Sequence, residues 1–269
     1  MTTSLTSWLG GLSSIQLALV CCLFFIAITL IGIVLIHPLM RRLIHGERQA
    51  NDVVIFVAAN YGLVYAVLLG LLTVATFQTT KDLQDHVAGE ASSLSTMYHS
   101  ADGYPEPLRS QLKSELRDYT RYVIEKDWPA HRQARTPQGG EHRLQAIREA
   151  LFSFEPKSKT QEVLHGEIIR QFNAMSVSRE ERLSAVSSSM PGVLWYVVIF
   201  GGVLTVVFLW MIHMEFIPQI FLVVLTAVFI GLMTFLIFAM DHPLQGAVSV
   251  GPRPFQSVYD LVMKWDESS

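Results

Sequence analysis

One apolar stretch of the sequence carries amide side chains at a spacing that could serve ion passage. Asn60 and Gln78 lie at the two ends of a strip that recurs every three or four positions, as one face of a helix does. The strip comprises Asn60, Val64, Val67, Leu71, Val74 and Gln78. Several copies of such a helix around one axis would place the amides in wet vestibules and the apolar side chains at a constriction that gates by dewetting. The alternative is a strip that faces lipid, with Asn60 bonded to a neighbouring helix and Gln78 among the headgroups.

A second face of the same stretch carries small residues four positions apart. These are Gly62, Ala66 and Gly70, and small residues at this interval let membrane helices approach closely. We therefore expect a helix-packing surface here. Thr73 and Thr76 have a local interpretation, because a Thr hydroxyl can bond the backbone of its own helix one turn earlier.

Residues that could hold a metal or perform catalysis are sparse. His86 and Glu90 share a helix face, but a metal site needs three or four ligands, so an exposed polar pair is the favoured interpretation. The sequence contains neither a Gly-rich phosphate loop nor the His-Glu-x-x-His, Cys-x-x-Cys and Gly-x-Ser-x-Gly motifs. We expect no metal, no cofactor and no enzymatic activity.

Composition excludes several classes of protein. Of the 269 residues, 51% are hydrophobic and 16% are charged, which is untypical of a water-soluble enzyme. The net charge is −3, and no Lys/Arg block alternates with aromatic residues, so a nucleic-acid partner is not expected. Ionisable residues are absent from the middles of the apolar runs, which argues against a proton-coupled pump.

Four apolar runs are long enough to cross a bilayer as helices. They cover residues 15–36, 53–77, 193–214 and 216–240, each about 20 residues or more. The first run exceeds the usual apolar length of a signal peptide and has no Lys or Arg before it, so a retained anchor is expected. The chain is thus predicted to be a multi-pass protein of a bacterial inner (plasma) membrane, in contact with the lipid bilayer.

The remaining sequence predicts helices outside the membrane. Residues that are apolar except for Glu90 step by three and four along three segments: Leu83, Val87, Glu90, Leu94 and Met97; Leu108, Leu112, Leu116, Tyr119 and Val123; and Leu144, Ile147, Leu151 and Phe154. A fourth helix is suggested by a less regular series: Val163, Ile168, Phe172, Met175, Leu183, Val186 and Met190. Breaks are expected near Gly103, Trp128-Pro129, Gly139 and Pro156. No strand-period segment of useful length occurs, so the predicted fold is all-α.

The expected domain order follows from these elements. Residues 1–77 hold the first pair of transmembrane helices, 78–191 a helical extramembrane domain, 192–240 the second pair, and 241–269 a C-terminal tail. Four spans place both termini and the extramembrane domain on one side. Arg41, Arg42 and Arg48 follow the first span, so the positive-inside rule favours a periplasmic over a cytoplasmic location for that domain.

Several motifs in order carry a resemblance to a known family. They are YGLVYAVLLGLLTVATF, GEASSLSTMYHSA, LRSQLKSELRDYTRYVIEKDWP, REERLSAVSSSMPGVLWYVVIFGGVL and FAMDHPLQGAVSVGPRPF. Together they resemble the bestrophin-like membrane protein family, once catalogued as a domain of unknown function, over about Tyr61 to Tyr259. The family's acid-Trp-Pro triplet is met by Asp127-Trp128-Pro129. Its Asp-Arg-Pro-Phe-x-Gly turn becomes Asp241-His242-Pro243-Leu244-Gln245-Gly246, with His and Leu in place of Arg and Phe.

The resemblance has functional implications. Bestrophins are oligomeric ion channels whose second span lines the pore, which makes the strip from Asn60 to Gln78 the expected pore lining. It implies a homo-oligomer, with a pentamer by analogy, that passes inorganic ions. It also favours a cytoplasmic extramembrane domain, against the charge rule. The alternative function is a non-conducting membrane scaffold whose central helical domain binds a partner protein.

A structural turn is expected at the end of the fourth span. Pro243 stops the helix, Gly246 turns the chain, and Asp241 lies at the last helical turn, where the helix dipole disfavours a negative charge. One interpretation leaves Asp241 hydrated among the headgroups. The favoured one pairs it with a basic residue near the span exits, namely Lys81, Arg179 or Arg182.

Overall fold

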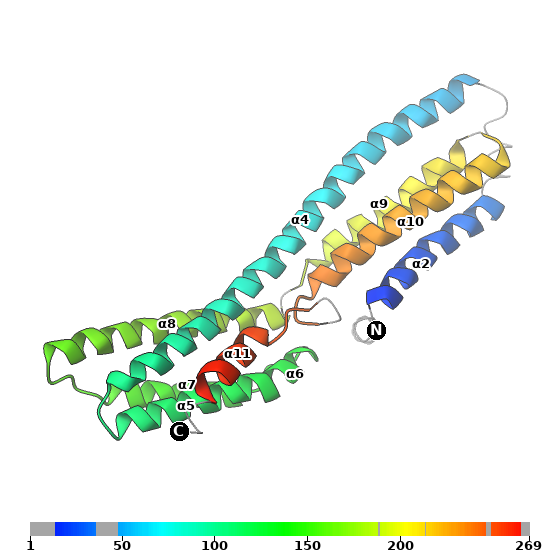
Figure 1. Ribbon diagram of the computed structural model, residues 1–269. Coiled ribbons are helices and arrows are strands. Elements are labelled where there is room, and N and C mark those ends of the chain that lie inside the picture. The colour runs from blue at the N-terminus through cyan, green and yellow to red at the C-terminus, as the bar shows by residue number, and fades with distance from the viewer. Residues whose placement is uncertain (1–13, 36–47, 188, 213, 246–248, 265–269) are drawn as a thin grey trace. The chain divides into compact units, whose positions relative to one another are not determined.

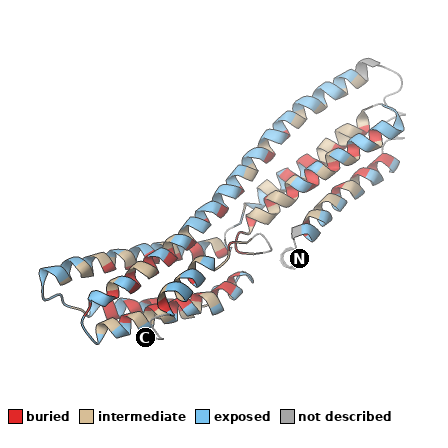
Figure 2. Ribbon diagram, in the orientation of Figure 1, coloured by how far each residue is buried: buried red, intermediate tan, exposed pale blue. Residues whose placement is uncertain are grey.

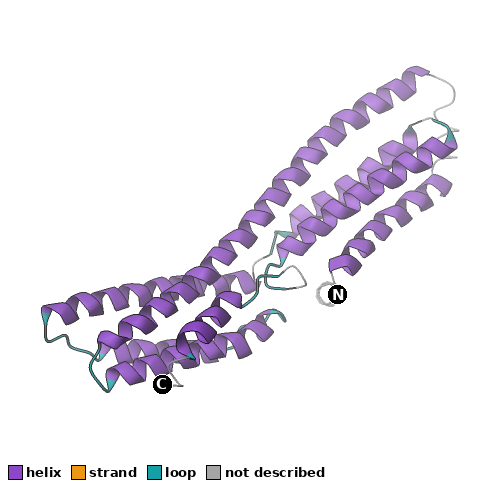
Figure 3. Cartoon of the chain, viewed as in Figure 1, coloured by secondary structure: helices purple, strands orange, loops and turns teal. Residues whose placement is uncertain are grey.

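The chain folds into helices throughout the part that the structure describes. A computed structural model describes residues 14–35, 48–187, 189–212, 214–245 and 249–264, and all its regular elements are helical (Figure 3). Contacts divide the chain into two compact units. The membrane unit comprises residues 1–78, 189–241 and 246–248, and the extramembrane unit comprises 79–188, 242–245 and 249–269.

In the described part of the chain, four helices are long and apolar enough to cross a membrane. They are α2 (Ser14–Leu35), α4 (Arg48–Ser100), α9 (Gly192–Met211) and α10 (Phe216–Asp241) (Figure 1). The expectation of an all-α protein with four spans is thus confirmed. α9 ends a few residues before the predicted limit, because Ile212 is extended and Gln219 donates to the carbonyls of Leu209 and Ile212 at 3.3 and 3.2 Å.

Within the membrane unit, α2 packs along α10 at short range. A Cβ atom at Gly231 would lie 2.7 Å from the Cα atom of Cys22, so only glycine permits this approach of the two backbones. Phe25, Ala227 and Ile230 fill the contact and are almost fully buried. Because lipid is as apolar as the helices, no hydrophobic effect drives helices together inside a bilayer, and close packing of this kind holds them in contact.

Two tyrosines connect α4 to α9 in the same unit. The hydroxyl of Tyr61 donates to the carbonyl of Gly201 at 2.9 Å, and that of Tyr65 donates to the carbonyl of Val198 at 2.7 Å. A Cβ atom at Gly201 would lie 2.3 Å from the Tyr65 ring, so the glycine makes room for that side chain. The contact fixes which face of α4 is turned towards α9.

The extramembrane unit has one apolar core built from the predicted helical stripes. Its helices are the C-terminal part of α4, α5 (Leu108–Tyr122), α7 (Gly139–Phe152) and α8 (Lys159–Ser187), with the 3-10 turn η1 (Ala101–Gly103) after α4. The residues of the first three stripes are buried or half-buried. In α8 the stripe differs from the prediction. Val163 is 67% exposed, and the buried series at three- and four-residue steps includes Arg179 and Arg182.

The predicted break at Trp128-Pro129 is wrong. α5 continues through a π-helical turn, η2 (Val123–Asp127), into the short helix α6 (Trp128–His131). The amide of Trp128 donates to the carbonyl of Val123, five residues earlier. This wider turn accommodates Pro129, which lacks an N–H and in a regular helix would clash with the carbonyl four residues before it.

The C-terminal tail packs on the extramembrane core. It forms α11 (Arg253–Val258) and the π-helical turn η3 (Tyr259–Met263). Phe255 and Met263 are fully buried, and Val258, Tyr259 and Val262 pack against the same cluster. These contacts make the tail part of the extramembrane core.

Candidate functional site

The strip from Asn60 to Gln78 lies on the face of α4 that points away from the rest of the membrane unit. The side chains of Val64, Val67, Leu71 and Val74 are 68, 56, 66 and 65% exposed. Tyr65 and Leu69, on the opposite face, are buried against α9 and α10. Figure 2 shows the contrast between this largely exposed half of α4 and the more buried helices α9 and α10. Among the described residues, the apolar side chains of the strip are thus largely uncovered.

The polar residues near this strip bond locally where their partners are defined. The Nδ2 atom of Asn60 donates to the carbonyl of Phe56 at 2.8 Å, and Gln78 is exposed. The hydroxyls of Thr73 and Thr76 donate to the carbonyls of Leu69 and Leu72 at 2.8 and 3.1 Å. The local interpretation of the two threonines is therefore confirmed.

The small-residue strip lies beside the apolar strip on α4. A Cβ atom added at Gly62 or Gly70 would meet nothing within 4 Å, and Ala66 is exposed. Close helix contacts among the described residues use other glycines, including Gly201 and Gly231. A packing role for Gly62, Ala66 and Gly70 therefore remains a prediction, because no described residue lies within 4 Å of a Cβ atom at either glycine.

Asp241 ends α10 and bonds the start of α9. Its Oδ1 atom accepts the amide of Met190 at 2.6 Å, and its Oδ2 atom accepts the indole Nε1 of Trp195 at 3.1 Å. Two of the three predicted basic partners, Arg179 and Arg182, pair instead with other carboxylates. Pro243 lies in the turn that follows, where its carbonyl accepts the amide of Val250 at 2.8 Å, and Gly246 lies outside the described residues.

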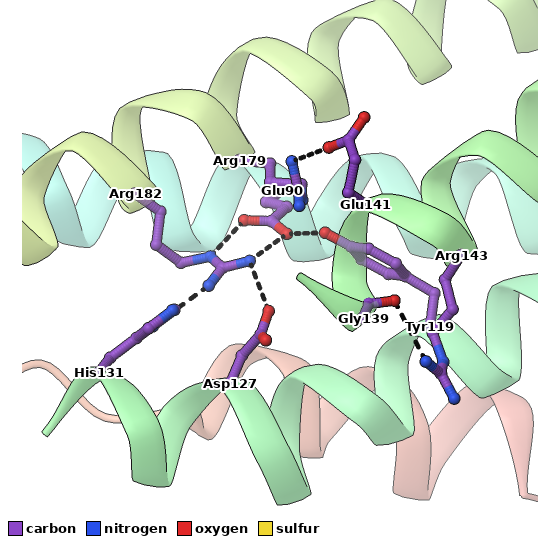
Figure 4. Close-up of polar contacts among 9 residues, drawn as sticks. All are labelled: Glu90, Tyr119, Asp127, His131, Gly139, Glu141, Arg143, Arg179 and Arg182. Carbon is purple, nitrogen blue, oxygen red and sulfur yellow. Dashed lines mark hydrogen bonds and ion pairs between the residues drawn. The ribbon is translucent and has the colours of Figure 1, made fainter. Parts of the chain in front are cut away.

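A buried polar cluster occupies the extramembrane core, with Arg182 at its centre (Figure 4). The guanidinium of Arg182 donates to both oxygens of Glu90, from Nε at 2.7 Å and from Nη2 at 3.0 Å. Both side chains are 0% exposed. The Nη2 atom lies 3.7 Å from Oδ2 of Asp127, and Nη1 lies 3.4 Å from Nδ1 of His131. One guanidinium thus contacts groups from α4, η2 and α6.

Further side chains extend this cluster. The Tyr119 hydroxyl donates to Oε1 of Glu90 at 2.6 Å, and Nη1 of Arg179 donates to Oε2 of Glu141 at 2.9 Å. The rings of Trp128 and Phe255 lie 5.6 and 5.8 Å from the Arg182 guanidinium carbon, within the range of cation–π attraction.

Burial sets the protonation states in the cluster. Burial raises the pKa of Asp127 to about 6, against the opposing attraction of Arg182 and Arg179. The pKa of His131 is lowered to about 3, mainly by burial and further by the charges of Arg182 and Arg179. His131 is therefore neutral near pH 7. Since arginine only donates, Nδ1 accepts from Arg182 and the ring proton lies on Nε2.

Sequence reasoning missed this cluster, although its signal was visible. Glu90 was interpreted as half of an exposed pair with His86, and this is wrong, because Glu90 is 0% exposed and bound to Arg182 while His86 is half-buried. The signal was an acid at a core position of one stripe together with Arg179 and Arg182 at core positions of another. Among the described residues, no group of three or more His, Cys, Asp or Glu side chains could hold a metal ion.

Comparisons with known proteins bear on this architecture. Residues 23–255 match the Bestrophin-like domain family. A variant of a bacterial bestrophin homologue from Klebsiella pneumoniae shares 11% identity, covers 92% of this chain and 96% of its own, and has a TM-score of 0.70. Another structure of that homologue shares 10% identity over 91% and 96% of the two chains, with a TM-score of 0.67. At this identity the likeness concerns the fold. No curated protein matches the sequence at significant similarity.

Proposed function

Because the chain belongs to the Bestrophin-like domain family, we propose that it forms a passive ion channel as a homo-oligomer. The observation that carries this proposal is the strip on α4, where four large apolar side chains are more than half exposed within one chain. A second copy would cover the small-residue face, and a ring of copies would enclose the apolar strip. Five copies is the number that the likeness to bestrophins implies.

In the proposed pore, α4 lines the ion path. Asn60 and Gln78 flank an apolar segment in which Val64, Val67 and Leu71 form the constriction. Apolar constrictions of this kind gate by dewetting, so water and ions pass when the ring widens or becomes polar. The ions are inorganic, and no reaction is required of the protein.

A planar bilayer with unequal salt on its two sides tests the proposal. We expect purified protein to give a current whose reversal potential identifies the favoured ion. Val67→Ser or Leu71→Ser should raise conductance, because a hydroxyl lowers the cost of wetting. Leu225→Ser is the matched control, since Leu225 is 59% exposed on α10 and is expected to face lipid. A flat trace at every voltage would overturn the channel and favour the non-conducting scaffold.

The membrane and the orientation belong to the same proposal. We propose a bacterial inner membrane, with both termini and the extramembrane unit on one side. The charge rule favours the periplasm for that side, and the likeness to bestrophins favours the cytoplasm. Arg41 and Arg42, on which the charge rule depends, lie outside the described residues. A reporter fused after Ser269 that matures in only one compartment decides between the two sides.

A further inference from the structure

The carboxylate of Asp127 is buried without the hydrogen bonds that normally stabilise such a charge. The side chain is 2% exposed. Oδ2 lies 3.7 Å from Nη2 of Arg182, beyond hydrogen-bond distance, and Oδ1 has no partner among the described residues. A buried carboxylate that accepts two or three N–H groups stays ionised to low pH. Asp127 lacks these donors, so its ionised form depends on charge attraction alone.

The charges around Asp127 leave this attraction incomplete. The guanidinium of Arg182 is already engaged at two nitrogens by Glu90, and Arg179 is bound to Glu141. Two carboxylates therefore share the Arg182 charge in the core.

Charged groups on three neighbouring helices act on the charge of Asp127. Arg182 and Arg179 come from α8, Glu90 from α4 and Arg143 from α7. His131 from α6 is neutral and contacts the same Arg182 guanidinium.

Space beside the carboxylate is kept by a glycine at the first turn of α7. A Cβ atom at Gly140 would lie 3.2 Å from Oδ2 of Asp127 and 3.4 Å from Nη2 of Arg179. The carboxyl group of Asp127 and the guanidinium of Arg179 thus both approach the Cβ position at Gly140, from η2 and α8 respectively. Among the described residues, the two groups form no ion pair. A carboxyl group can gain or lose a proton here without breaking an existing hydrogen bond.

We infer that Asp127 is a reversible proton-binding site, whose occupancy sets how strongly η2 and α6 are attracted to α8 and thereby regulates conduction. The proton site stands on the geometry above, and its effect on conduction rests on the proposed channel. When Asp127 is ionised, its charge attracts Arg182 and Arg179. When it is protonated, that attraction is lost and Glu90 alone neutralises Arg182.

Infrared difference spectroscopy of the full chain in detergent tests the proton site without any current. We expect a protonated carboxyl band that disappears as pH rises through about 6, some two pH units above exposed carboxyls. Asp127→Asn should remove the band. Asp102→Asn is the matched control, because Asp102 belongs to the same unit, is 59% exposed and pairs with Lys113 at 2.6 Å. If the band in the wild type titrates near pH 4, as for exposed acids, the proton site is refuted.

Bilayer currents between pH 5 and 8 test the regulatory half. Asn resembles the protonated acid, so Asp127→Asn at pH 7.5 should conduct as the wild type does at pH 5, and it should lose the step near pH 6. Asp102→Asn should keep the step. An infrared titration near pH 6 with a pH-independent current refutes the regulation. Absence of current at every pH refutes the channel, and the infrared result still decides the proton site.

Discussion

Replacing Asp127 by Asn should change how stability depends on pH, and the sign can be worked out. The folded pKa of about 6 lies above the value near 3.9 of an unfolded Asp, so the folded state holds the proton more tightly. Stability from Asp127 is present at low pH and is lost as pH rises from about 4 to about 6. The loss is about 3 kcal/mol, at about 1.4 kcal/mol per pKa unit. The free energy of unfolding of Asp127→Asn should equal that of the wild type at pH 4, and at pH 7 it should be higher by up to this amount.

The titration of His131 has the opposite effect on stability over an overlapping pH range. Its folded pKa of about 3 lies below the unfolded value near 6.5, so its contribution is lost as pH falls from about 6.5 to about 3. Between pH 4 and 6 the folded wild type holds a proton on Asp127, and the unfolded chain holds one on His131. Unfolding therefore releases no net proton from this pair, and their two contributions to the pH dependence of stability nearly cancel. His131→Gln should therefore gain stability over the wild type as the solution becomes more acidic.

Denaturant unfolding of the full chain in detergent, followed by circular dichroism at several pH values, measures both variants. The quantity of interest is the difference in free energy of unfolding between variant and wild type, since the other titrating groups cancel. Asp102→Asn serves as control, with a nearly constant difference. Curves for Asp127→Asn and wild type that run parallel from pH 4 to pH 7 would refute the reasoning.

Four further substitutions probe other contacts. Arg182→Met should lower the free energy of unfolding by about 3 to 5 kcal/mol, because Glu90 is left buried without its cation. The double variant with Glu90→Gln should recover much of this loss, and denaturant unfolding of both variants would show it. Tyr119→Phe should cost about 1 to 3 kcal/mol by removing the donor to Glu90, again measured by unfolding. Gly231→Val should lower the melting temperature in detergent, because the Cβ atom of the valine would meet the Cys22 backbone. An unchanged melting temperature would show that α2 and α10 can move apart at little cost in free energy.

The helices could be predicted from the sequence because each membrane span is a long apolar run and the extramembrane helices have periodic apolar faces. The α5 and α7 stripes, for example, need only the three- and four-residue steps of Leu112, Leu116 and Leu144, Ile147. The cluster could not be predicted in this way. Pairing of Glu90 with Arg182 joins residues 92 positions apart, and periodicity says nothing about which helices face each other. The partners of Asp241 were missed for a similar reason, because a backbone amide and an indole leave no charge pattern in the sequence.

The π-helical turn η2 has a consequence for how the chain tolerates change in length. It inserts one residue between α5 and α6, and it is followed by Trp128 and His131, which are both buried in the cluster. Deleting one residue from η2 would restore a regular helix but rotate everything after it by about 100° relative to α5. Trp128 and His131 would then leave the core even though neither was altered. Packing therefore fixes the number of residues at this position, so chains that keep the cluster should vary at the exposed residues Glu125 and Lys126 of η2 and not in its length.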